Sequence, residues 1–160
     1  MEKIISTDSP VYAVAVSLDG SCIICGSDHG KIRIREMETG EALCTPLLGH
    51  TGRICSIAVS HRHFVSGSAD KTIWTWNADT GETLGIPLEG HVDDLTSVSI
   101  LPKGNRIVSG SGDGTIRVWD IETGEVLGAP LKGHGSLRHN VPVGIALCHV
   151  PMTRPFVYGI

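Results

Sequence analysis

The clearest structural pattern in the chain is the sequence Ile107-Val108-Ser109-Gly110-Ser111-Gly112-Asp113-Gly114-Thr115-Ile116-Arg117-Val118-Trp119-Asp120. With the preceding arginine it contains two segments, Arg106–Ser111 and Thr115–Asp120. Both are rich in β-branched residues interspersed with small or polar ones, as strands are. Glycine between them can supply the positive φ that a tight turn requires. This segment therefore predicts a β-hairpin.

The pattern continues on both sides of the hairpin. A strand is expected before it, over Leu95–Leu101, with a turn at residues 102–105. A further turn at residues 122–125 is expected to lead into a last strand over Val126–Leu131. The unit thus consists of four short strands, each near the usual length of about five to six residues.

The same unit recurs along the chain, and three independent markers repeat at spacings of 41 and 43 residues. They are Gly49-His50, Gly90-His91 and Gly133-His134; Gly26-Ser27, Gly67-Ser68 and Gly110-Ser111; and Thr39-Gly40-Glu41, Thr80-Gly81-Glu82 and Thr123-Gly124-Glu125. A shared period of this length indicates a repeat architecture.

The Gly-His, turn-Asp and Trp-Asp markers resemble the WD (Trp-Asp) repeat, the blade of a β-propeller. The narrower wording, Thr-Gly-Glu followed by Leu-Gly-x-Pro-Leu-x-Gly-His, is similar to the sensor domains of fungal receptor-type NTPases. The resemblance implies an all-β, partial propeller of three four-stranded antiparallel blades plus the start of a fourth. One domain, 1–160, would hold blades at about 10–48, 53–89, 94–132 and, in part, 141–160.

The resemblance also implies one hydrogen-bonded tetrad of His, Ser, Asp and Trp in each complete blade. The expected sets are His50, Ser66, Asp70 and Trp76, then His91, Ser109, Asp113 and Trp119. Ser, His and Asp also form nucleophilic triads. We favour the structural interpretation, because the set occurs twice, includes a Trp, and has no G-x-S-x-G elbow. No catalytic residue is therefore expected, and residues 110–115 do not form a dinucleotide loop, since no third glycine or helix follows.

The first unit lacks these polar residues, having Cys25, His29, Arg35 and Glu36 in their places. Its rigidity is expected to come from the apolar side chains of Val14, Val16, Ile23, Ile32 and Ile34. Cys22 and Cys25 form a C-x-x-C on an expected strand, where residues three apart point to opposite faces. We therefore expect neither a metal site nor a cofactor.

The composition of the chain indicates which partners it is not expected to bind and in which compartment it is expected. The formal charge is −4 and hydrophobic residues make up 41 % of 160 residues. This argues against binding to nucleic acid or a membrane surface through bulk charge, and against disorder. The odd count of 5 cysteines favours a reducing, intracellular compartment, the cytoplasm more than the nucleus.

Three and a half repeats fall short of a ring, because a propeller has four to eight blades of about 40–45 residues each. Three explanations remain open. The chain is part of a larger propeller protein, or it completes a ring by self-association at about seven blades, or it is an open arc held by a partner. Residues 3–6 are a candidate outer strand that would lock a ring.

The function expected from the resemblance is a non-catalytic scaffold that binds other proteins. The alternative is a detached ligand-sensing segment of a receptor-type NTPase, although the chain has no phosphate-binding loop. By position in the repeat, the candidate contact residues are Tyr12, Asp28, Arg53, Cys55, Ala69, Asp94, Thr96 and Gly112. Tyr and Arg are frequent among residues that dominate binding energy.

Overall fold

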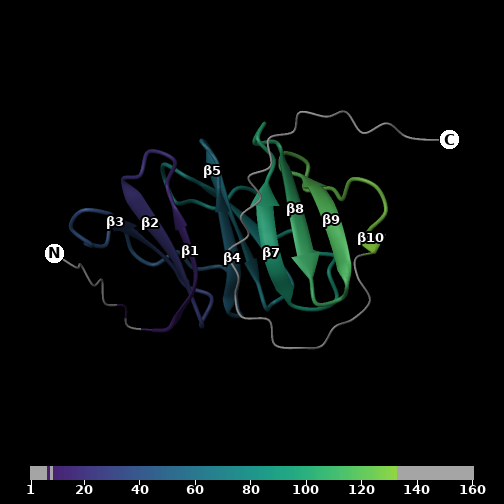
Figure 1. The fold of residues 1–160 in the computed structure, drawn as a ribbon, viewed down its shortest axis with the longest axis horizontal. Coiled ribbons are helices and arrows are strands. Elements are labelled where there is room, and N and C mark those ends of the chain that lie inside the picture. The colour runs from purple at the N-terminus through teal and green to yellow at the C-terminus, as the bar shows by residue number, and fades with distance from the viewer. Residues whose placement is uncertain (1–6, 8, 133–160) are drawn as a thin grey trace.

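The computed structural model describes residues 7 and 9–132, and within them every regular element is a β-strand. The expected strand over residues 3–6 and the expected partial blade at about 141–160 lie outside these residues. The strands form three antiparallel sheets, arranged one after another as in a segment of a propeller (Figure 1). The expected all-β fold is confirmed.

Each sheet is a meander, in which consecutive strands pair with each other. The first sheet holds β1 (Val11–Val16), β2 (Cys22–Ser27) and β3 (Ile32–Glu36). The second holds β4 (Ile54–Val59), β5 (His63–Ser68) and β6 (Ile73–Asn77). The third holds β7 (Leu95–Ile100), β8 (Arg106–Ser111), β9 (Thr115–Asp120) and β10 (Leu131–Lys132).

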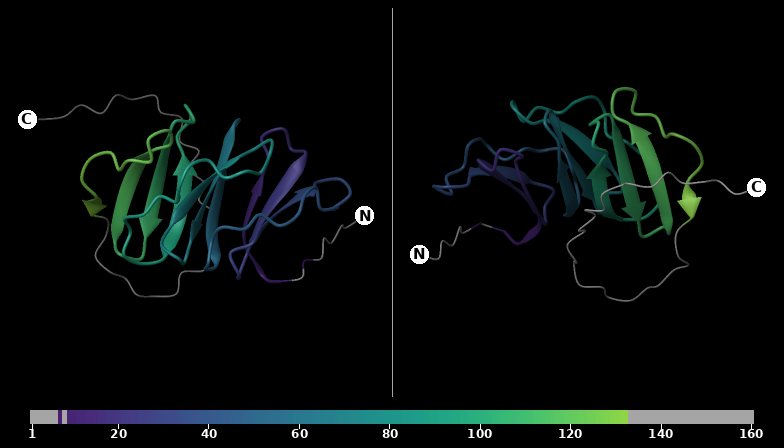
Figure 2. Two further views of the ribbon diagram at one scale, coloured as in Figure 1. Left: turned by 180° about the vertical axis from the view of Figure 1, so that it is seen from behind. Right: turned by 45° about the horizontal axis from the view of Figure 1, so that its top comes forward.

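The first strands of the three sheets, β1, β4 and β7, contact one another in that order. The sheets therefore fan out from a common inner side, as the two further views also show (Figure 2). Because every sheet repeats the same hairpin pattern, equivalent residues of the three sheets occupy equivalent places in the arc.

The fourth strand is shorter than the sequence pattern predicts. The expected strand over Val126–Leu131 consists of one bridge, between Trp119 and Val126, and the two-residue strand β10. In the first two sheets the fourth strand is reduced to pairs of isolated bridges. Two residues interrupt pairing in the third sheet: Gly128 has a φ of 80°, and Pro130 has no N–H to donate.

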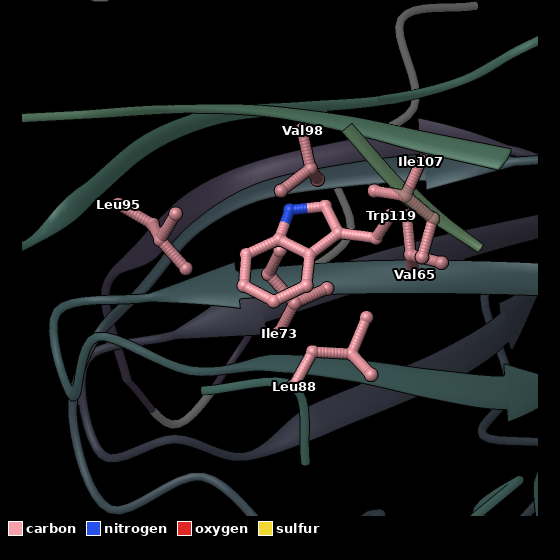
Figure 3. Close-up of a cluster of buried hydrophobic side chains, with 7 residues drawn as sticks. All are labelled: Val65, Ile73, Leu88, Leu95, Val98, Ile107 and Trp119. Carbon is pink, nitrogen blue, oxygen red and sulfur yellow. The ribbon is translucent and has the colours of Figure 1, made fainter. Parts of the chain in front are cut away.

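Two apolar clusters hold neighbouring sheets together. The cluster between the second and third sheets surrounds the indole of Trp119 (Figure 3), and its members are Val65, Ile73, Leu88, Leu95, Val98, Ile107 and Trp119. The cluster between the first and second sheets consists of Ala13, Ile24, Ile32, Ile54, Phe64 and Trp76. The hydrophobic core thus lies between sheets, so each repeat depends on its neighbours for burial.

The expectation for the first sheet is partly wrong. Ile32 is buried and Ile34 packs against the core, but Val14 and Val16 are exposed. The reason is alternation along β1: Ala13 faces the second sheet, so Val14 points to the opposite side, where the described chain offers no further sheet.

Candidate functional site

The second sheet contains a continuous hydrogen-bonded network of buried polar groups. The Nδ1 of His50 lies 2.8 Å from Oδ2 of Asp70, and its Nε2 lies 2.8 Å from Oγ of Ser66. The Nε1 of Trp76 donates to the same Ser66 Oγ at 2.8 Å. Thr72 extends the network by donating from Oγ1 to Oδ1 of Asp70 at 2.6 Å. The structure therefore brings all four expected residues together, with Thr72 as a fifth member that the sequence reasoning missed.

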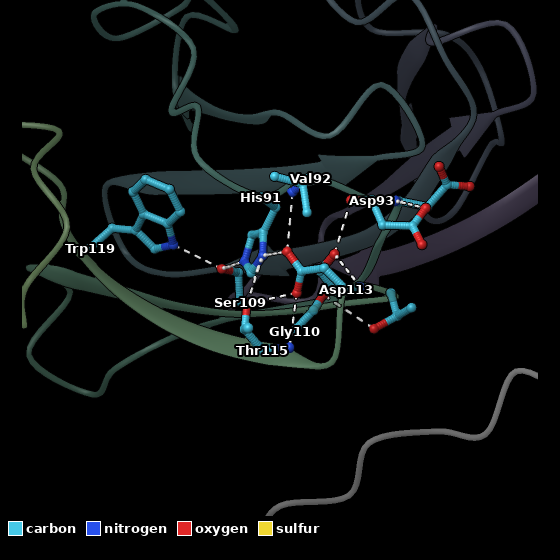
Figure 4. A network of polar contacts seen from close by, with 11 residues as sticks. His91, Val92, Asp93, Ser109, Gly110, Asp113, Thr115 and Trp119 are labelled. Carbon is cyan, nitrogen blue, oxygen red and sulfur yellow. Dashed lines mark hydrogen bonds and ion pairs between the residues drawn. The ribbon is translucent and has the colours of Figure 1, made fainter. Parts of the chain in front are cut away.

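The third sheet repeats this geometry (Figure 4). His91 contacts Asp113 at 2.9 Å through Nδ1 and Ser109 at 2.8 Å through Nε2. Trp119 Nε1 donates to Ser109 Oγ at 2.8 Å, and Thr115 Oγ1 donates to Asp113 at 2.6 Å. The members come from two neighbouring strands, from the turn between them and from the loop before the sheet. Each tetrad therefore ties these four segments together.

Burial and the indole donor, rather than the order of the Ser-His-Asp hydrogen bonds, distinguish the tetrads from a nucleophilic triad. The indole of Trp76 donates to Ser66 Oγ, the Ser66 hydroxyl donates to His50 Nε2, and the Nδ1–H of His50 donates to the carboxylate. Ser66 and Ser109 are essentially without solvent exposure, at 0% and 1%. A substrate cannot reach either hydroxyl, so these sets serve as satisfied internal networks.

The tetrad carboxylates are held in their charged form. Burial alone would raise the pKa of Asp70, but hydrogen bonds from His50 and Thr72 outweigh it and hold that pKa well below the usual value. Burial alone would also raise the pKa of Asp113. Hydrogen bonds, above all the one from Thr115, outweigh this effect and hold that pKa below its usual value. Both carboxylates therefore favour the folded state when they are ionised.

This arrangement predicts loss of stability in acid. Because the folded-state pKa of each tetrad Asp lies below its ordinary value of 3.8, the stabilisation is complete above that pH. It is lost as the pH falls below 3.8 toward the folded-state values. Denaturation by guanidinium chloride at a series of pH values should show the midpoint falling in this acidic range.

Removal of the carboxylates provides the control for this prediction. The variant Asp70→Asn/Asp113→Asn should be less stable at neutral pH and should show a flatter acid dependence. Asp79→Asn, at an exposed residue outside the tetrads, should keep the wild-type dependence. An identical acid slope in the double variant would show that the tetrad carboxylates do not govern it.

The first sheet has no tetrad. Arg35 stands where Trp76 and Trp119 stand in the other sheets, and its Nη1 donates to the carbonyl of Gly40 at 2.9 Å. Cys25 occupies the serine position, and burial is the main cause that raises the pKa of its thiol. This sheet consequently lacks the cross-strand polar network of its two neighbours.

A second group of residues lies at one end of the inner strands. In β1, β4 and β7 the pairing register shifts at the second residue, which is Tyr12, Cys55 or Thr96. Such a bulge leaves one residue out of the ladder and redirects its side chain. The same irregularity in three successive strands places three of the candidate contact residues along one rim of the arc.

Arg53 links this rim across two sheets. Its guanidinium carbon lies 5.1 Å from the ring centroid of Tyr12, in a cation–π contact. Its pKa is raised, chiefly by a hydrogen bond with Cys55, and the charges of Tyr12 and Asp94 add to this effect. We call Tyr12, Arg53, Cys55, Asp94 and Thr96 the rim cluster.

The other candidate contact residues lie in the turns beside the rim. Ala69 donates its backbone N–H to the carbonyl of Arg53, and Gly112 donates to that of Asp94. Asp28 lies in the turn after β2 and is not a member of the rim cluster. The sequence pattern signals neither the bulges nor the stacking of Arg53 on Tyr12.

Other kinds of site have no geometric support in the described residues. No group of His, Cys, Asp and Glu there is arranged to hold a metal ion. The cysteines Cys22, Cys25, Cys44 and Cys55 are free thiols. No helix within residues 7 and 9–132 is long and apolar enough to cross a membrane.

Comparison with known proteins identifies the repeat. The family model WD40 (WD domain, G-beta repeat) matches residues 2–35, 40–77 and 81–120, which is well over half of the chain. No curated protein matches the sequence significantly. The narrower resemblance to fungal receptor-type NTPases gains no support from these findings.

Solved structures of similar fold include natural and designed proteins. The crystal structure of RRP9 WD40 repeats aligns with a TM-score of 0.75 at 23% identity, over 82% of this chain and 41% of that one. The structure of U3-55K aligns with a TM-score of 0.75 at 22% identity, over 82% and 42%. The chain thus spans less than half the length of either. The computationally designed Ika4 protein aligns with a TM-score of 0.72 at 31% identity, over 85% and 83%.

Proposed function

Because the chain belongs to the WD40 (WD domain, G-beta repeat) family, we propose that it is a non-catalytic scaffold that binds another protein through its rim cluster. The family is generally non-catalytic and typically provides platforms for protein interaction. The observation that supports this use here is the rim itself, where three bulged residues and Arg53 present an aromatic ring and a stacked cation to solvent.

The chemistry of the rim cluster suits a protein partner. Tyr and Arg are enriched among the residues that dominate binding energy, since both offer large contact area and directional hydrogen bonds. The cation–π contact fixes the Arg53 side chain before binding, so less conformational freedom is lost on association. Asp94 adds a negative charge beside Arg53, which gives the surface both signs of charge.

We propose proteins rather than nucleic acid or a membrane as the partners, since the net charge is −4. We also propose an intracellular and mainly cytoplasmic location, on the odd cysteine count. No observation favours the alternative, a detached ligand-sensing segment of a receptor-type NTPase. The incomplete arc of three sheets is consistent with a scaffold that works as part of a larger assembly.

The proposal predicts that truncation at the rim weakens binding without unfolding the chain. Tyr12→Ala and Arg53→Ala should each lower affinity for a captured partner by about 30-fold, the effect of losing about 2 kcal/mol at a dominant contact. Arg62→Ala, at an exposed arginine on the β4–β5 turn, is the matched control and should bind normally.

A partner is first captured by affinity purification with the wild-type chain. Titration of the purified partner then measures its affinity for the wild type and for each variant. The proposal requires a partner that the wild type and Arg62→Ala retain and both rim variants lose. If the rim variants bind every captured protein as tightly as the wild type does, the rim cluster is not the binding surface.

A further inference from the structure

The two ends of the arc carry apolar residues that are more exposed than their equivalents inside it. We call the outward side of the first sheet the leading face, defined by Val11, Val14 and Val16. We call the outward side of the third sheet the trailing face, defined by Val108, Gly110, Ile116 and Leu131. Figure 1 shows the two sheets that carry these faces, the purple and the green one, at opposite ends of the arc.

The leading face matches the faces that the second and third sheets bury against their predecessors. Val11 is 38% exposed, whereas Ile54 and Leu95 at the same place in β4 and β7 are completely buried. Val14 is 59% exposed, whereas its equivalent Val98 is 6% exposed. The leading face is therefore one half of a sheet-to-sheet junction without its other half among the described residues.

The trailing face matches the faces that the first and second sheets bury against their successors. Ile116 is 39% exposed, whereas Ile32 and Ile73 at the same place in β3 and β6 have no exposure. Leu131 is 60% exposed, whereas Leu88, its equivalent in the second repeat, is 7% exposed. The trailing face is therefore the opposite half of the same kind of junction.

Glycines show how the two halves fit. At the first internal junction a side-chain carbon on Gly26 would collide with Ile54 at 2.4 Å, because that isoleucine lies directly over the glycine. At the second junction Gly67 lies beneath Val98, whose Cγ1 would be 2.7 Å from such a carbon. In both cases an aliphatic side chain of the following sheet fills the space that the glycine leaves.

Gly110 occupies the same position in the third sheet, and no side chain of another described sheet fills its space. A side-chain carbon there would meet only Thr96 Oγ1, at 3.6 Å, and Thr96 belongs to the same sheet. The partner that this site lacks is an aliphatic pair on an inner strand. Val11 and Val14 on β1 are such a pair, placed as Leu95 and Val98 are on β7.

From this complementarity we infer that the chain binds a second copy of itself head to tail, with the leading face of one copy on the trailing face of the other. Two identical leading faces would place valines against valines with no glycine to receive them, so a same-face pairing does not fit. A head-to-tail contact closes into a ring when its rotation permits, and two copies of three sheets reach the range of about four to eight blades.

One residue makes this junction weaker than the internal ones. Arg35 stands on the leading side where Trp76 and Trp119 fill the internal junctions, so the largest apolar contribution is missing. The association should therefore depend on protein concentration, and it is independent of the partner proposed for the rim cluster.

The test uses one variant for each face. Val14→Asp puts a charge on the leading face and Ile116→Asp puts one on the trailing face, both at exposed positions that the fold does not need buried. Sedimentation velocity on the full chain should show the wild type at twice the 17.0 kDa of one chain, or a higher multiple, as concentration rises. Each variant alone should stay at one chain, because every copy lacks the same face.

Mixing the variants gives the decisive result. An equimolar mixture should form a species of two chains, because the intact trailing face of Val14→Asp meets the intact leading face of Ile116→Asp. Ile86→Asp, at an 82% exposed residue of the second repeat, is the control and should associate as the wild type does. Circular dichroism checks that all variants stay folded.

Three results would overturn the inference. A wild type that remains one chain at all concentrations would show that the chain does not bind a second copy of itself. A variant that still associates on its own would show that a different surface is used. A mixture that remains at one chain per particle, with both variants folded, would show that the two faces do not bind each other.

Discussion

Replacing Trp119 with alanine is expected to lower the free energy of unfolding by about 3–5 kcal/mol, as loss of a fully buried aromatic side chain does. The indole is 1% exposed and lies at the centre of the cluster between the second and third sheets. Its removal leaves a cavity among aliphatic side chains and takes away the donor to Ser109. Urea denaturation followed by circular dichroism measures the loss.

A conservative variant separates the two contributions of this side chain. Trp119→Phe keeps most of the apolar volume but loses the N–H that donates to Ser109, so its cost should fall clearly below that of Trp119→Ala. A loss of less than about 1 kcal/mol for Trp119→Ala would show that the indole is not buried as described.

Ile73→Ala is expected to lower the free energy of unfolding by about 2–5 kcal/mol, the range for truncation of a buried isoleucine. Ile73 has no exposure and packs between the second and third sheets. Ile116→Ala removes the same atoms at the same repeat position, where the side chain is exposed. Its expected cost is about 0.5 kcal/mol, as for surface substitutions.

The comparison is best made in a chain that cannot self-associate. Both substitutions are introduced into the Val14→Asp variant, so that contacts between copies do not add to the measured stability. If Ile116→Ala proves as costly as Ile73→Ala in that setting, the third sheet is covered within its own chain and the open arc described here is wrong.

Most of the fold could be predicted from the repeat period of the sequence. It placed the strands at Arg106–Ser111 and Thr115–Asp120, which are the bounds of β8 and β9. It failed for the last strand of each unit, because alternation of apolar residues does not show where a proline or a positive-φ glycine interrupts pairing. Gly128 and Pro130 reduce that strand to a bridge and two residues.

Among the polar residues, the tetrads could be predicted from the sequence and the rim cluster could not. Repeated His, Ser, Asp and Trp identify the tetrads, because buried hydrogen-bonded groups must recur wherever the same unit recurs. The rim cluster does not repeat: Tyr12, Cys55 and Thr96 are three different residues at one bulged position. The exposure of Val14 and Ile116 was equally hidden, since a residue pattern shows which face is apolar but not whether a neighbour covers it.

The recurring polar residues form internal networks, each of which holds the segments of one sheet together. The most direct test of these networks is hydrogen exchange at the three indole N–H groups of the chain, followed by NMR. The indole protons of Trp76 and Trp119, which donate to buried serines, should exchange only when the protein opens. Trp74 is only partly buried, and its indole proton should exchange much faster. Equal and rapid exchange of all three would contradict the account.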